Sequence, residues 1–177
     1  MTIAHAPLAT AARLRREHQR RSQDRTILAR RHAEFGQCMR QLVQLVDRLD
    51  ESGPDPHSRR LAAAIVDQVD ELLPDVLLRE SRALLSASTP PADAWTQQAT
   101  EHLRADHGWI SGNWCELRPL IDGVACGQSW VDPDRLRDAA ELFCALQREH
   151  AALATTLLER RGVDVDADDE APLVAAH

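Results

Sequence analysis

The chain has 177 residues and a formal net charge of −7, which suits one domain with one sizeable core. All of its basic residues are arginine, which excludes lysine Schiff-base chemistry and the lysine of a phosphate-binding loop. The acidic balance argues against nucleic acid as a partner, and the lack of a long apolar run argues against a membrane-spanning segment. Few glycines, with many Ala, Leu, Arg and Glu residues, favour helix over sheet.

The first 25 residues form an arginine-rich extension. The stretch 12–31 carries eight arginines against Glu17 and Asp24. We expect this extension to be helical, and either to overhang the rest of the fold or to form a separate segment. A solvated helical face is its ordinary interpretation, and contact with a membrane surface or a polyanion is the alternative.

Three clusters of turn residues, 50–58, 86–93 and 122–134, divide the rest of the chain into four segments with a helical apolar period. Four long amphipathic helices with short connections predict an all-α, up-down-up-down four-helix bundle over residues 26–162. Within it, Pro119 is expected to kink the third helix or end it early, and Gly162 to end the fourth. We expect the acidic segment 163–177 to be a disordered tail.

Each of the four apolar stripes contains one ionisable residue. Counted from the adjacent turn, these residues lie 17 to 19 positions along their helices, which places them at the same depth to within roughly 3 Å. A histidine or glutamate in a core must be paired, must bind a ligand, or must remain as a costly buried polar group. The four residues, in chain order, are His32, Glu80, His107 and His150.

Three imidazoles and one carboxylate that converge inside a bundle are suitable ligands for Fe or Zn. The alternative is that each is a separately hydrogen-bonded core residue. The matched depth of the four residues is compatible with a metal site and with separately bonded core residues. The metal site is therefore a hypothesis.

The chain resembles the hemerythrin-like, or HHE cation-binding, domains over about residues 26–162. The similar stretches are RRHAEFGQC (30–38), ADHGWISGNWCELRPLI (105–121) and FCALQREHAAL (143–153). Those domains are four-helix bundles that hold non-haem di-iron with histidines and carboxylates. The resemblance implies His32, Glu80, His107 and His150 as iron ligands, with Glu80 as the bridging carboxylate.

Several positions depart from the pattern of that family. The residues that stand where further ligands are expected are Val76, Ser81, Leu103, and Ala154 or Thr155. Two irons need roughly twice the ligands that this sequence offers. We therefore expect non-haem iron as a mononuclear or an incomplete di-iron site, or a bundle that has lost its metal.

Three functions follow as hypotheses. The first is a cytoplasmic non-haem iron protein that binds or senses dioxygen, peroxide or nitric oxide. Such a protein could be a monomer or a homo-oligomer. The second is a metal-free interaction or regulatory bundle that acts through the arginine-rich extension or a helical surface. The third is a thiol-based redox sensor that uses Cys38, Cys115 or Cys144. Because the cysteines lack CxxC spacing, we expect their resting state to be free thiols in a reducing cytoplasm.

Overall fold

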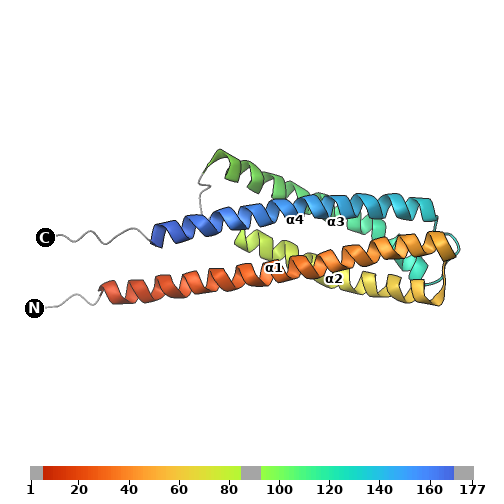
Figure 1. The fold of residues 1–177 in the computed structure, drawn as a ribbon, viewed down its shortest axis with the longest axis horizontal. Helices are drawn as coiled ribbons and strands as arrows, with labels where there is room; N and C mark the ends of the chain where they lie inside the picture. The colour runs from red at the N-terminus through yellow and green to blue at the C-terminus, as the bar shows by residue number, and fades with distance from the viewer. Residues whose placement is uncertain (1–5, 85–92, 170–177) are drawn as a thin grey trace, which may run out of the picture.

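The computed structural model describes residues 6–84 and 93–169. Each helix packs on the next one in the chain, and the last helix packs back on the first. The α1–α2 and α3–α4 turns lie at one end of the molecule, and both termini lie at the other (Figure 1). The predicted all-α four-helix bundle is therefore confirmed. Its helices are α1 (Ala6–Ser52), α2 (Pro56–Ala83), α3 (Ala94–Ala125) and α4 (Pro133–Asp169).

Aspartates fix the starts of the last three helices. The side chain of Asp55 accepts hydrogen bonds from the first turn of α2, and the Ser58 hydroxyl oxygen accepts one from the Asp55 backbone N–H. Asp93 accepts from the Thr96 N–H of α3, and Asp132 accepts from the backbone of the first turn of α4. These caps satisfy backbone donors that a helix start otherwise leaves unpaired. The predicted breaks at 50–58 and 122–134 therefore lie between helices, whereas most of 86–93 lies outside the described residues.

Neither Pro119 nor Gly162 ends its helix. Pro119 lies in the interior of α3, which continues to Ala125, so the predicted early end of this helix is wrong. The proline side faces solvent, while Leu117 and Ile121 on either side are fully buried and hold the helix against its neighbours. Likewise, α4 runs through Gly162 to Asp169, because a single glycine weakens a helix interior without having to end it.

The arginine-rich extension is part of α1. This helix runs from Ala6 without a break at residue 25, so the extension is not a separate helical segment. Arg16 and Arg20 are exposed on it. The extension projects beyond α2 at the end of the molecule where the termini lie (Figure 1).

The buried apolar side chains form two clusters along the bundle. The larger, which we call the turn-end core, lies toward the α1–α2 and α3–α4 turns and includes Phe35, Ile110, Trp114 and Phe143. The smaller, which we call the far-end core, lies on the side of the termini. Its six residues are Leu28, Leu84, Ala99, Leu103, Ala154 and Leu157.

The described residues contain no helix that is both long enough and apolar enough to span a membrane.

Candidate metal centre

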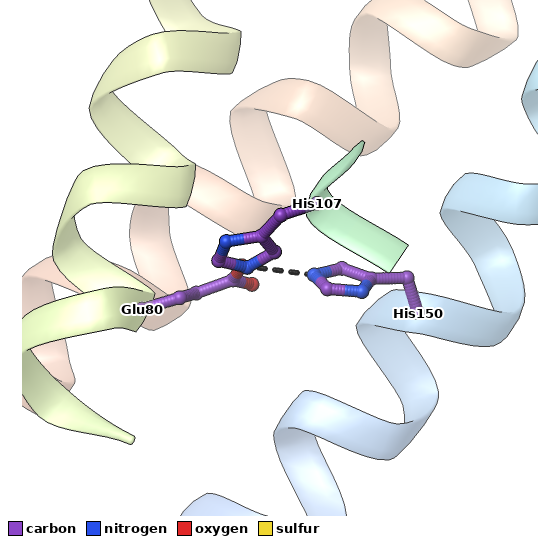
Figure 2. A group of neighbouring side chains, drawn as sticks. All are labelled: Glu80, His107 and His150. Carbon is purple, nitrogen blue, oxygen red and sulfur yellow. Dashed lines mark hydrogen bonds and ion pairs between the residues drawn. The ribbon is translucent and has the colours of Figure 1, made fainter. Parts of the chain in front are cut away.

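The four predicted site residues meet in a polar layer between the turn-end core and the far-end core. One oxygen of Glu80, Oε2, lies 2.8 Å from Nε2 of His107 and 2.8 Å from Nε2 of His150. The other oxygen, Oε1, lies 2.7 Å from Nε2 of His32. The side chains of Glu80, His107 and His150 point toward one another from α2, α3 and α4 (Figure 2). Three helices thus each contribute one histidine to a single carboxylate, which the fourth helix, α2, supplies.

The helical period explains why these residues meet. In every helix the polar residue lies on the buried stripe, between a residue of the turn-end core and one of the far-end core. On α1, for example, His32 follows Leu28 by four residues and precedes Phe35 by three. Antiparallel packing then brings four such positions to one level of the bundle.

Glu80 is the centre of the layer and is only 1% exposed. Burial alone would raise the pKa of its carboxyl group, because it disfavours the charged form. The hydrogen bonds from His107, His150 and His32 outweigh that penalty and hold the pKa of Glu80 below its ordinary value. Glu80 is therefore a carboxylate, and it can only accept hydrogen bonds.

His150 lies between two carboxylates. Its Nε2 faces Glu80, and its Nδ1 lies 3.3 Å from Oδ2 of Asp106. Burial lowers the pKa of His150, but both carboxylates raise it, and the net shift is upward. Because both partners are carboxylates, a hydrogen on each ring nitrogen would satisfy both contacts, and the raised pKa of His150 favours that imidazolium form.

The spacing of the donor atoms is compatible with one metal ion. Glu80, His107 and His150 each offer one ligand atom, and the three atoms lie within 4.8 Å of one another. Ligand atoms bound about 2.1 Å from one ion, in nearly perpendicular directions, lie roughly 3 Å apart. The observed contacts of 2.8 Å to the Glu80 oxygen match that spacing. Two imidazoles and one carboxylate are also the ligand set of mononuclear non-haem iron sites.

His32 takes a different position from the other two histidines. It bonds the opposite oxygen of Glu80 and does not belong to the group of three convergent ligand atoms. Its side chain is 12% exposed, compared with 16% for His107 and 3% for His150. His32 is thus placed either to orient the Glu80 carboxylate or to complete the coordination from its other side.

The positions that lack the further family ligands are occupied by packing residues or face solvent. Val76, Leu103 and Ala154 are buried among apolar side chains, whereas Ser81 and Thr155 are exposed. Substitution by apolar residues leaves one carboxylate in the layer, so a second metal would lack the charge that bridging carboxylates supply.

The cysteines form no cluster. All four thiols are free, with Cys38 and Cys144 buried and Cys115 and Cys126 exposed. Cys38 donates to Oε1 of Gln68, and Cys144 lies against Met39. Burial raises the pKa of both buried thiols, which makes them poor nucleophiles at neutral pH. This arrangement gives the thiol-sensor hypothesis no support.

Sequence reasoning missed Asp106. Its carboxylate contacts His150 and also lies 3.6 Å from Nε2 of the exposed His102. A carboxylate that accepts from the outer nitrogen of a metal-binding histidine fixes the ring and its tautomer. The sequence offered one signal for Asp106, which is that it is adjacent to the predicted ligand His107. Two adjacent residues on a helix can each reach toward a different neighbouring helix.

No protein-family model, curated protein or solved structure is significantly similar to this chain. The resemblance to hemerythrin-like domains therefore remains a prediction from the motifs above.

Proposed function

We propose that this chain is a hemerythrin-like non-haem iron protein that holds one ion in the polar layer. Glu80, His107 and His150 are the ligands, and His32 supports the carboxylate or binds as a fourth ligand. The observation that carries the proposal is the convergence of three ligand atoms from three helices within 4.8 Å. Buried polar groups cost stability, and a bound cation supplies a reason for keeping four of them together.

The hydrogens on the imidazoles define what binding requires. For His107 and His150 to act as ligands, their Nε2 hydrogens must leave, because a metal binds the nitrogen lone pair. Asp106 can then retain the Nδ1 hydrogen of His150 and hold its ring in place. The positive charge that a protonated ring places near Glu80 would be replaced by that of the ion.

Three protein ligands leave coordination positions open. Bound iron would supply at those positions a binding place for dioxygen, peroxide or nitric oxide. Apolar residues of the two cores lie on both sides of the polar layer along the bundle. We propose that the chain binds or senses one of these small ligands, in the cytoplasm.

Nitric oxide binding tests this function. The full chain is loaded with Fe(II) without oxygen, and nitric oxide is added while the visible and electron paramagnetic resonance spectra are recorded. We expect a nitrosyl signal in the wild type that is lost in His107→Ala. His57→Ala is the matched control, because His57 is exposed in the first turn of α2, at the opposite end of that helix from Glu80. Loss of the signal in both variants, or no signal in the wild type, would contradict the proposal.

The second candidate function is a metal-free interaction or regulatory bundle. The observation that favours it is that each of the three histidines hydrogen-bonds to Glu80, so all four polar side chains have a partner without an ion. The exposed arginines of the extension would then carry the interaction. This function predicts that deleting residues 1–25 removes partner binding, while substitutions at His32 or Glu80 change stability alone and added iron changes neither.

A further inference from the structure

A pocket of about 320 Å³ lies between α1 and α4, on the turn side of the polar layer. The α1–α4 interface is the least extensive of the four interfaces between adjacent helices of the bundle. The pocket opens to solvent, since Arg40, Val43 and Arg148 on its wall are exposed. His32 and His150 form its inner wall and separate it from Glu80.

The interior of the pocket is mostly apolar. Phe35, Met39, Val76 and Ala151 line it. Its volume is roughly twice that of the ~150 Å³ engineered cavity that admits benzene. It therefore suits an organic molecule of about ten non-hydrogen atoms, which is larger than a diatomic gas.

One buried donor in this wall has no partner. Gln147 lines the pocket and is only 6% exposed. Its Nε2 is buried, and no described residue accepts a hydrogen bond from it. Buried donors without acceptors are rare because desolvation makes them costly. The amide is thus available to an acceptor that enters the pocket.

The charge at the mouth has one sign. Arg40 on α1 and Arg148 on α4 both line the pocket, and none of the described lining residues is acidic. In a chain with a net charge of −7, a pocket bordered by two arginines and no carboxylate favours an anion. Arginine also bonds carboxylates with good geometry.

We propose that this pocket binds an organic monocarboxylate with a short apolar chain. The carboxylate accepts hydrogen bonds from Gln147 and the arginines, and the chain packs along Phe35, Met39 and Val76. The site is separate from the metal ligands in its chemistry and does not require the ion. A ligand at the inner wall would lie against His32 and His150. Its binding would therefore also change the surroundings of these two side chains in the polar layer.

Octanoate is a suitable probe, with 1-octanol and octylamine as neutral and cationic analogues. Binding to the full chain, freed of metal with a chelator, is measured by isothermal titration calorimetry and by NMR chemical-shift changes. We expect octanoate to bind about tenfold more tightly than either analogue. Equal binding of octanol, or no octanoate binding at millimolar concentration, would overturn the proposal.

Substitutions locate the binding. Arg148→Gln, at an exposed position that cannot disturb the core, should weaken octanoate about threefold to tenfold, and Gln147→Leu should do the same. Arg135→Gln is the control, an exposed arginine on the same helix that does not line the pocket. Equal octanoate affinity in Arg148→Gln and Arg135→Gln would refute the site. A parallel Fe(II) titration separates failure of this proposal from failure of the metal site, because each ligand is measured without the other.

Discussion

The turn-end core and the far-end core differ in size and in how the chain closes around them. The turn-end core contains 21 buried residues and lies beside two short interhelical turns. Among the described residues the far-end core contains six, and it lies where α1 and α4 extend beyond the bundle. The polar layer separates the two cores, so its residues have far more described apolar neighbours on the turn side.

The largest effect is expected in the turn-end core. Phe143 is fully buried. Its ring meets the ring of Phe35 edge to face and lies tilted against the ring of Trp114. Phe143→Ala should lower the free energy of unfolding by about 3–5 kcal/mol. Leu157→Ala in the far-end core should cost about 2 kcal/mol, since fewer neighbours surround the cavity. Urea denaturation measures both values. Equal losses would show that the two cores are equally important for stability.

The second prediction concerns the polar layer without metal. Glu80→Ala removes the shared acceptor of three histidines and should destabilise the metal-free chain by about 3 kcal/mol. Glu80→Gln retains an acceptor oxygen and should cost less. Thermal and urea unfolding of the chelator-treated proteins give the comparison. A neutral Glu80→Ala variant would mean that the layer contributes no stability in the absence of an ion.

The third prediction concerns Asp106. Asp106→Asn removes the negative charge beside Nδ1 of His150 while keeping the size of the side chain. Affinity for a divalent metal should fall by about 10- to 100-fold, because the ring loses its orienting partner. Competition with a chromophoric chelator measures this change, and Asp134→Asn, at an exposed position at the start of α4, is the control. Unchanged affinity in Asp106→Asn would show that His150 needs no positioning residue.

The smallest effect is expected at the turn between α1 and α2. The guanidinium of Arg48 and the backbone of Ser58 hold the pKa of Asp55 below its ordinary value. A lowered folded-state pKa stabilises the fold above the unfolded-state pKa, near 4, and that contribution is lost as the pH falls further. Asp55→Asn keeps the cap but not the charge, so its Tm should lie a few degrees below the wild type at pH 7.

Melting curves at several pH values test the sign of this prediction. The Tm difference between the wild type and Asp55→Asn should stay constant from pH 7 to about 5 and shrink below pH 4. A difference that grows on acidification would contradict the assigned direction.

Much of the architecture could be predicted from the sequence because one period repeats along the chain. Apolar spacing located four helices, and counting from the turns brought His32, Glu80, His107 and His150 to one level, where the structure places them. Helix ends were less predictable. Pro119 and Gly162 have unfavourable local preferences, but packing of the neighbouring residues decides whether the helix continues.

The details of the site could not be predicted. Asp106 contacts His150 across 44 positions of sequence, and a polar residue at the edge of a stripe gives no sign of which neighbour it reaches. The role of Gln147 could not be predicted either, because the sequence does not show that its side-chain amide lacks a partner or that it lines a pocket. The orientation of His32 toward the other oxygen of Glu80 depends on side-chain conformations that spacing does not determine.

Metal stoichiometry tests the central claim most directly. The full chain is dialysed without oxygen against Fe(II), and bound iron per chain is measured by plasma mass spectrometry in the wild type, Glu80→Gln and His57→Ala. The polar layer predicts one iron in the wild type and in His57→Ala, and a strong loss in Glu80→Gln. Iron-free wild-type protein, or equal iron content in all three proteins, would contradict the assignment of Glu80, His107 and His150 as a metal centre.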